Sequence, residues 1–302
     1  MKHLRLFEYI DAVVRAGSIR RASETLFITP SALDRRIQQV EEELGTQIFE
    51  RHAKGMRLTS AGEIFLDYVR RHLADLDRVR SEIEGLKGLR KGHVSIVASQ
   101  AMALKFLPEQ IRLFRERHPG VSFSVRIADR GEALKALMAF EAELAVVVFP
   151  KMNSDVLQLI MVAQPVVALM SMHHPLAEQT TVRLSECLNY PLVLPDASLG
   201  VGELLHPILV RRTSKAQISA ETNSFELMRG LLQDNRSVGF QVAIGAPDNL
   251  QQGTIVSRSI DPRDVPTAPL ICAQLRGRTL PVAAARFADQ LTQQLDKMDM
   301  SP

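Results

Sequence analysis

Residues 18–51 read SIRRASETLFITPSALDRRIQQVEEELGTQIFER and contain two amphipathic helix patterns separated by a short turn. Ser18 is a favoured N-cap, because a serine oxygen can accept from the free backbone N–H groups at a helix start. Apolar residues then recur on one face at three- and four-residue spacing: Ile19, Ala22 and Leu26. This first helix is predicted to end near Phe27.

The second helix is predicted to start at Thr29-Pro30. A hydroxyl N-cap is followed there by a proline at the first helical position, where the missing N–H costs nothing. Inward-facing apolar residues follow at intervals of four, three and four: Leu33, Ile37, Val40 and Leu44. Gly45 supplies a left-handed stop. The pair therefore has the form of a helix-turn-helix whose second helix enters the major groove of DNA.

The opposite face of the second helix carries the side chains that we expect to contact bases. These are Ser31, Asp34, Arg35 and Gln38, with Arg36 at their side. Short polar residues at a helix start allow close approach to base edges, and arginine suits phosphate or guanine. The alternative is a charged, solvated helix face, which is the interpretation we favour for Gln39 and for residues 41–43.

Three segments resemble the N-terminus of LysR-type transcriptional regulators: 7–26 (FEYIDAVVRAGSIRRASETL), 31–51 and 58–62 (LTSAG). The resemblance is close over residues 4 to about 66 and looser to about 290. It implies a winged helix-turn-helix in a sequence-specific transcriptional regulator that binds double-stranded operator DNA, with RNA polymerase as a further candidate partner. The DNA-binding residues are then expected to be Ser18, Arg20, Thr29, Pro30, Ser31, Asp34, Arg35, Arg36, Gln38, Arg51 and Lys54.

Two positions depart from the family pattern. Members of the family often have Gln-Pro where this chain has Pro30-Ser31, and serine where it has Asp34. An acid beside DNA phosphates is unfavourable unless it pairs with Arg35 or accepts from a cytosine amino group. The exact set of base-reading residues is therefore open at these positions.

A wing is predicted after Gly45. Residues 48–51 (IFER) and 56–59 (MRLT) have the pattern of two short strands around the turn 53–55 (AKG). Lys54 at the tip either reaches phosphate or the minor groove or is a solvated hairpin lysine, and the two interpretations weigh equally. Arg51 either holds the DNA backbone or braces the wing. An opening amphipathic helix that ends at Ala16-Gly17 is expected to pack behind the helix pair.

Ser60-Ala61-Gly62-Glu63 fits a capping box at the start of a long helix. Six apolar residues and one histidine follow at alternating spacings of four and three, as in a heptad seam: Phe65, Val69, His72, Leu76, Val79, Ile83 and Leu86. The seam could pack on its own chain, but we expect the same helix of a second subunit in a homodimer or homotetramer. Recognition helices would then meet half-sites roughly 34 Å apart. A hinge is expected near residues 85–92.

From His93 onwards strands alternate with helices, which predicts a largely parallel, doubly wound α/β sheet. Residues 101–118 are expected to be helical, with Pro108 starting a second segment or kinking a longer one. The layout resembles the LysR-type effector domain, which is similar to the two-lobed type 2 periplasmic binding fold. The expected domains are 1–60 (DNA binding), 61–92 (linker helix and hinge) and 93–302 (effector binding), with lobe one at 93–164 and 268–296 and lobe two at 165–267.

Ligands in such sheets bind at the carboxyl ends of the strands. The effector candidates are Ser99, Gln100, Ala101, Phe149, Leu194, Pro195, Ser198, Thr222, Asn223 and Ser224. Ser99 and Ser224 both precede helices, whose free N–H groups favour an anion such as a carboxylate. For any one of these residues an ordinary helix cap is the favoured interpretation. Their convergence on one cleft is implied by the resemblance.

Composition sets bounds on the class of protein. The 302 residues, 46% of them hydrophobic, suffice for a small and a larger globular domain. We expect no membrane span and no secretion signal, and we place Cys187 and Cys272 in a reducing cytoplasm as buried thiols rather than a redox pair. The net charge of +3 lies entirely in residues 1–92, because residues 93–302 hold twenty basic and twenty acidic side chains.

The sequence offers no catalytic constellation. His173-His174 lies in a proline-bounded loop without metal-ligand spacing, so a surface loop is expected. Phosphate loops, a nucleophile elbow and a paired-carboxylate site are missing, so neither an enzyme nor a cofactor is expected. The function expected is a regulator whose DNA binding or activation responds to a small organic anion. The alternative is a non-secreted small-molecule-binding protein without specific operator recognition.

Overall fold

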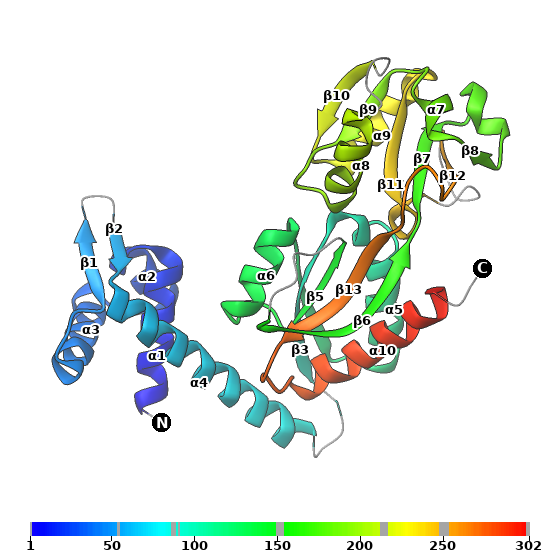
Figure 1. The fold of residues 1–302 in the computed structure, drawn as a ribbon. Coiled ribbons are helices and arrows are strands. Elements are labelled where there is room, and N and C mark those ends of the chain that lie inside the picture. The colour runs from blue at the N-terminus through cyan, green and yellow to red at the C-terminus, as the bar shows by residue number, and fades with distance from the viewer. Residues whose placement is uncertain are drawn as a thin grey trace. The chain divides into compact units, whose positions relative to one another are not determined.

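The computed structural model describes residues 2–52, 55–85, 89, 91–148, 154–211, 217–247 and 254–299. The chain forms two compact units, Met1–Ile83 and Glu84–Pro302 (Figure 1). Within the described ranges, none of the helices combines the length and the apolar character that crossing a membrane requires.

The first unit contains the predicted helix-turn-helix and wing. Its elements are α1 (Lys2–Ala16), α2 (Ile19–Leu26), α3 (Pro30–Leu44), the antiparallel strands β1 (Phe49–His52) and β2 (Gly55–Leu58), and α4 (Ser60–Gly85). The Thr29 hydroxyl accepts from the Ala32 N–H at 3.3 Å, and Gly45 ends α3 at φ 67°. Both predicted signals at the ends of α3 are therefore confirmed.

Three local expectations in this unit were wrong. Ser18 occupies the N-cap position of α2, but its hydroxyl makes no capping bond, since the Ser18 backbone carbonyl alone accepts from the Ala22 N–H. The cap of α4 is Thr59 rather than Ser60, because the helix begins at Ser60 and the Thr59 hydroxyl accepts from the Gly62 N–H at 2.9 Å. Leu44 is exposed, because α3 ends there, beyond the core.

The core of the first unit is built from side chains of α1, α2, α3, α4 and the segment at the start of β1: Ile10, Val13, Ala22, Leu33, Ile37, Val40, Ile48, Phe49, Leu66 and Val69. Two acids stabilise its edges. Asp11 accepts from Arg70 Nε at 2.9 Å and so joins α1 to α4. Glu41 Oε1 accepts from the N–H groups of Ile48 and Phe49 at 2.9 and 3.0 Å. Glu41 therefore holds the start of the wing and is not the solvated residue expected.

The second unit contains two sheets. The five-stranded sheet has the order β4-β3-β5-β13-β6, formed by Val121–Ile127, Gly92–Ala98, Leu144–Val148, Ala268–Leu275 and Val156–Gln164. The six-stranded sheet has the order β10-β9-β11-β7-β12-β8, formed by Ile218–Thr222, Leu192–Pro195, Val238–Val242, Val166–Ser171, Ile255–Ile260 and Thr181–Val182. We call the parts built on these sheets lobe one and lobe two.

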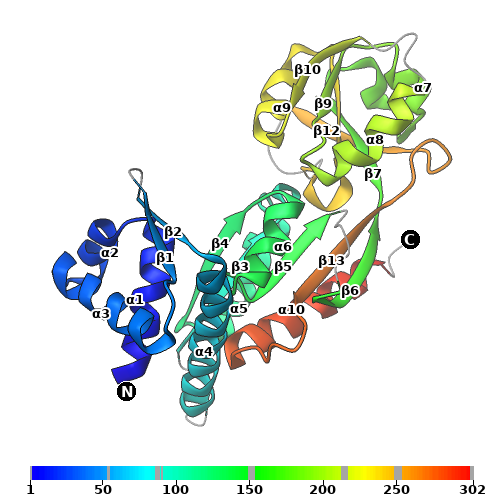
Figure 2. The same cartoon turned by 60° about the vertical axis from the view of Figure 1, so that its left-hand side comes forward.

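Both sheets are mixed, so the expectation of largely parallel sheets was wrong. In lobe one β3 is parallel to β4 and β5, whereas β13 is antiparallel to β5 and β6. In lobe two β7 is antiparallel to both β11 and β12. The physical reason is that the chain passes between the lobes twice, from β6 into β7 and from β12 into β13 (Figure 2). The first strand after each crossing, β7 in lobe two and β13 in lobe one, therefore runs antiparallel to the parallel strands beside it.

Helices cover the sheets of this unit. They are η1 (Gln100–Met102), α5 (Phe106–Arg117), α6 (Arg130–Met138), η2 (Pro175–Glu178), α7 (Leu184–Cys187), α8 (Gly200–Val210), α9 (Phe225–Leu231), η3 (Leu232–Asp234), η4 (Ala243–Gly245) and α10 (Val282–Asp299). The helical segment expected at 101–118 is broken after η1, and Pro108 lies in the first turn of α5. Proline therefore begins a second segment there.

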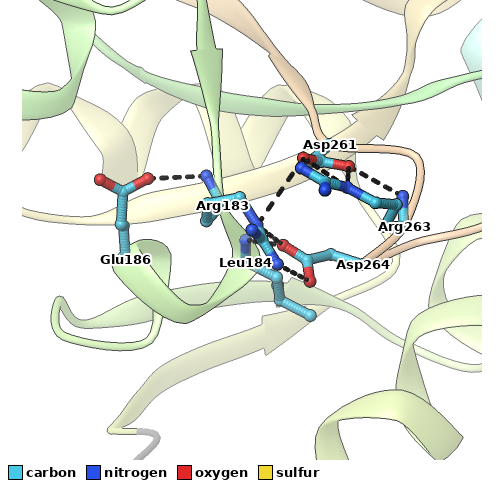
Figure 3. Close-up of polar contacts among 6 residues, drawn as sticks. All are labelled: Arg183, Leu184, Glu186, Asp261, Arg263 and Asp264. Atoms are coloured by element: carbon cyan, nitrogen blue, oxygen red, sulfur yellow. Dashed lines mark hydrogen bonds and ion pairs between the residues drawn. The ribbon is translucent and has the colours of Figure 1, made fainter.

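An ion network fastens the loop between β12 and β13 to lobe two (Figure 3). Arg183 donates to Asp264 from Nε at 2.7 Å and from Nη2 at 3.0 Å, and the Leu184 N–H donates to the same carboxylate at 3.0 Å. Arg263 donates to Asp261 and holds the pKa of that carboxyl well below its usual range. The hydrogen-bonded ion pairs of Asp261 and Asp264 therefore hold the loop near the start of α7.

His174 and both cysteines are buried. His174 is only 2% exposed, so the expected surface loop is wrong for it, although His173 is exposed. The Nδ1 atom of His174 accepts from the Leu176 N–H at 3.1 Å and caps η2. Cys187 and Cys272 are both buried free thiols, as expected, and burial raises the pKa of each to about 12. Neither is poised to react as a thiolate.

Candidate nucleic-acid interface and effector cleft

The outward face of α3 carries a hollow lined by Ser31, Ala32, Arg35, Arg36 and Gln39. Ser31 lies beside the helix cap, with its hydroxyl 3.3 Å from that of Thr29. Arg36 Nη1 donates to Gln39 Oε1 at 3.3 Å, whereas Arg35 is exposed and has no hydrogen-bond or ionic partner in the described residues. An unoccupied guanidinium beside small side chains at a helix start is free to approach a base edge.

Asp34 does not pair with its neighbour Arg35. Its Oδ1 accepts from Arg51 Nη2 at 2.5 Å, and its Oδ2 accepts from Gln38 Nε2 at 3.4 Å. Since Arg51 lies in β1, the ion pair joins the recognition helix to the wing. The pairing with Arg35 that the sequence suggested for this acid was therefore wrong, because Arg51 takes that place.

The remaining predicted DNA-binding residues do not line the hollow on α3. Pro30 is exposed at the start of α3, and Arg20 lies on α2 with its Nε 3.8 Å from Glu24. Lys54, the predicted wing tip, lies outside the described residues. The sequence interpretation missed Gln39, which was assigned to the solvated face. Its spacing of four residues from Arg35 places both on one side of α3 and was the available signal.

Phe27 is an unusual residue in the turn between α2 and α3. It is 93% exposed, and its backbone has φ 53° and ψ 42°. L-residues adopt this left-handed region at a cost, and bulky side chains do so rarely. Nothing in the sequence pattern indicated this conformation.

The predicted seam of α4 divides into a buried and an exposed part. Val69 is 0% exposed within the first unit, so its own core covers it and its assignment to a subunit interface was wrong. Phe65 is half-buried and packs edge-to-face on Phe7 with ring centroids 6.4 Å apart. The side chains that form the outward line are Ile64, Tyr68, His72, Leu76, Val79 and Ile83, of which Leu76 is half-buried. Leu86 lies outside the described residues.

A hollow lies between the lobes of the second unit. It is lined by Ser99, Gln100, Ala101, Ala128, Asp129, Val148, Ser198, Leu199, Gly200, Val201, Phe225 and Val242. Its free volume of about 20 Å³ is far below the roughly 300–1,000 Å³ of small-molecule pockets, so the hollow is nearly closed in the observed arrangement of the lobes.

Four of the predicted effector residues line this hollow and five do not. Ser99, Gln100, Ala101 and Ser198 are among its lining residues. Leu194 and Pro195 are buried inside β9, and Thr222, Asn223 and Ser224 also lie outside the lining. Phe149 is outside the described residues. The lining residues that the sequence interpretation missed lie at the carboxyl ends of β4, β5 and β11 and at the starts of α8 and α9.

Several polar groups around the hollow have local partners. Ser99 Oγ accepts from the Val148 N–H at 3.0 Å, and the Ser224 hydroxyl accepts from the Leu227 N–H at 3.2 Å as an ordinary helix cap. In contrast, Gly200 and Val201 are the first two residues of α8. N–H groups in a first helical turn have no acceptor within the helix, and they favour a negatively charged ligand group.

No cluster of three or more His, Cys, Asp or Glu side chains suited to a metal ion occurs in the described ranges.

Comparison with known proteins adds two family matches. Residues 4–63 match the model of the bacterial regulatory helix-turn-helix protein, lysR family, and residues 87–296 match the model of the LysR substrate binding domain.

Individual relatives match over most of their length. The HTH-type transcriptional activator CmpR of Synechocystis is 27% identical over 75% of this chain and 74% of its own. The transcriptional dual regulator GltC of Bacillus subtilis is 27% identical over 78% and 79%. Two solved structures share the fold at 19% identity. A full-length OxyR variant from Pseudomonas aeruginosa has a TM-score of 0.75, covering 95% of this chain and 94% of its own. CbnR with its target DNA has a TM-score of 0.65, covering 97% and 99%.

Proposed function

The chain belongs to the LysR family of transcriptional regulators, and we propose that its first unit binds an operator as a dimer while its second unit binds a small organic anion. The observation that carries the DNA-binding half is the free guanidinium of Arg35 beside Ser31 on a helix capped by Thr29. Arginine donates to guanine or phosphate, and a second arginine, Arg36, lies on the same face.

We propose that α4 forms the subunit interface through its outward apolar line. Ile64 and Ile83 are 75% and 58% exposed, and Tyr68 and Val79 are also exposed. An apolar line of this length on a solvated helix is unfavourable in a monomer and is covered when two copies pair. Two recognition helices in one dimer would contact half-sites about one helical turn apart.

The division into residues 1–60, 61–92 and 93–302 is part of the same proposal. We assign the interlobe hollow to the effector, with the first amides of α8 as donors to its anionic group. Binding there would change DNA binding through a population shift, limited by the effector's preference for one arrangement. We assign no catalytic role to either unit, place the protein in the cytoplasm with its DNA, and leave RNA polymerase as a candidate partner.

Footprinting of the purified protein on fragments of its own genome, at two salt concentrations, tests the operator half. Protection of an imperfect palindrome that survives moderate salt is the expected result. Diffuse protection that vanishes with salt would mean backbone attraction alone. That outcome would favour the alternative function, a small-molecule-binding protein without specific operator recognition.

A further inference from the structure

A side-chain hydrogen bond joins two lining residues of the hollow that belong to different lobes. Gln100 Oε1 accepts from the backbone N–H of Phe225 at 2.5 Å. Gln100 begins η1 in lobe one, directly after β3 and Ser99, and Phe225 is the first residue of α9 in lobe two. Both residues line the hollow, so the bond lies where a ligand held by both lobes would lie.

The Phe225 N–H depends on an acceptor from outside lobe two. The Ser224 hydroxyl accepts from the Leu227 N–H, and the Thr222 hydroxyl accepts from the Ser224 N–H at 3.0 Å. The local hydroxyls therefore bond to neighbouring amides, and the Phe225 N–H bonds to the Gln100 carboxamide. A carboxamide oxygen and a ligand carboxylate or amide oxygen are equivalent acceptors for such a donor.

The packing beside this bond is tight and leaves one polar side chain unsatisfied. A Cβ added to Gly245 would lie 2.7 Å from the Ala101 carbonyl oxygen and 2.4 Å from Gln241 Nε2, so η4 and η1 are in close contact. Gln241 is 0% exposed, and within the described chain neither of its side-chain amide atoms has a hydrogen-bond partner. An unsatisfied buried amide costs free energy. The Gln100 bond therefore favours the observed arrangement of the lobes, whereas the unsatisfied Gln241 amide lowers the stability of the packing beside it.

We propose that Gln100 is a built-in competitor of the effector. Its carboxamide occupies the lobe-two donor at Phe225, and the effector carries a carboxylate or amide oxygen that displaces it. The inference rests on the proposed effector role of the hollow and specifies its ligand chemistry, since an oxygen acceptor must replace the one removed. The lobe spacing is then set by whichever acceptor, the side chain or the ligand, bridges η1 and α9.

Amide hydrogen exchange at Phe225, resolved to single residues in the full-length protein, tests this directly and needs no known effector. Gln100→Ala removes the acceptor and should speed exchange at Phe225 at least tenfold, whereas Gln100→Glu keeps an oxygen acceptor and should preserve protection. The Leu227 N–H is the internal control, because its acceptor is the Ser224 hydroxyl. Gln100→Asn, shorter by one methylene, serves if the alanine variant does not fold. Equal exchange at Phe225 in the wild type and in Gln100→Ala would overturn the proposal.

Chemical rescue tests the competition itself. Acetate or acetamide added to Gln100→Ala should slow exchange at Phe225 again, with sodium chloride at matched ionic strength as the control. Rescue by acetate above acetamide would identify an anionic effector group, and the reverse a neutral amide. Fast exchange that neither compound slows would leave Gln100 as a tie between lobes and overturn its role as a competitor. The exchange experiments contain no DNA. A failed footprint would therefore count against operator binding, and a failed rescue would count against the competitor role of Gln100.

Discussion

Asp34 Oδ1 accepts a hydrogen bond from Arg51 Nη2 at 2.5 Å, and this ion pair joins the recognition helix α3 to wing strand β1. It explains how an acid can occupy the DNA-facing helix. The carboxylate is directed to the wing and its second oxygen is shared with Gln38, so Arg35 stays without an ionic partner on the same face. The pair also restrains Arg51, which would otherwise be free to reach a phosphate.

Replacing Asp34 by Asn should release Arg51 and remove an acid from the DNA-facing surface. We expect tighter binding to any duplex and a salt dependence steeper by about one unit of slope, because one more phosphate is neutralised. Fluorescence anisotropy over a salt series measures this. Glu42→Gln, an equal change of charge on an exposed part of α3, is the matched control. Identical slopes for the two variants would contradict the role assigned to Arg51.

Replacing Arg35 by Ala should weaken operator binding by about 1–3 kcal/mol and relax base preference at one position, as expected for a side chain that reads a base. Competition between the operator and single-base variants measures both effects. Arg20→Ala is the comparison, since a phosphate contact would weaken all duplexes uniformly. Unchanged affinity together with unchanged base preference in Arg35→Ala would reject the base-reading role.

Replacing Val79 and Ile83 together by Lys should produce monomers, because two charges would be buried in the apolar line of α4. Sedimentation velocity measures the oligomeric state, and operator binding should weaken in parallel. The double variant Asp77→Lys and Glu84→Lys is the control, because it places lysines on the same helix away from this line. A tightly associated dimer in the Val79 and Ile83 variant would refute the proposed interface.

Local signals in the sequence predicted the helix-turn-helix well because each one is satisfied within a few residues. The Thr29 cap and the Gly45 stop are of this kind. Two cap signals, at Ser18 and Ser60, nevertheless failed. Most other failures concern long-range contacts. The partner of Asp34 is 17 residues away, and the burial of Val69 and His174 depends on elements that no periodicity links to them. In the hollow, Gly200 and Phe225 were missed because the relevant helix starts meet only through the fold.

Replacing Phe27 by Asn should stabilise the first unit. Phe27 holds a left-handed backbone conformation at φ 53° with its ring in solvent, and asparagine adopts that region at less cost. We expect a gain of about 1 kcal/mol in the free energy of unfolding, measured by urea denaturation. Phe140→Asn is the contrasting variant. Phe140 also has a positive φ, but Arg278 lies 5.3 Å from its ring centroid, so this substitution loses a contact. Loss of stability in Phe27→Asn would show that the ring has a packing role.

His174 should make the stability of the second unit depend on pH. Burial lowers the pKa of His174 below its ordinary 6.5, against smaller opposing effects of the Arg236 carbonyl and Asp234. The neutral ring is therefore favoured in the folded state, where its Nδ1 accepts from the Leu176 N–H. A histidine with a depressed folded pKa contributes stability that is present above 6.5 and is lost as the pH falls through the folded value.

Replacing His174 by Asn should flatten that dependence, because asparagine retains an N-cap acceptor for Leu176 but does not titrate. Urea unfolding between about pH 7 and about pH 5 measures the slope, which should be smaller than in the wild type. His173→Asn changes the exposed neighbour and should leave the slope as it was. If His174→Asn and the wild type lose stability equally as the pH falls, another group carries the titration and burial of His174 is not its cause.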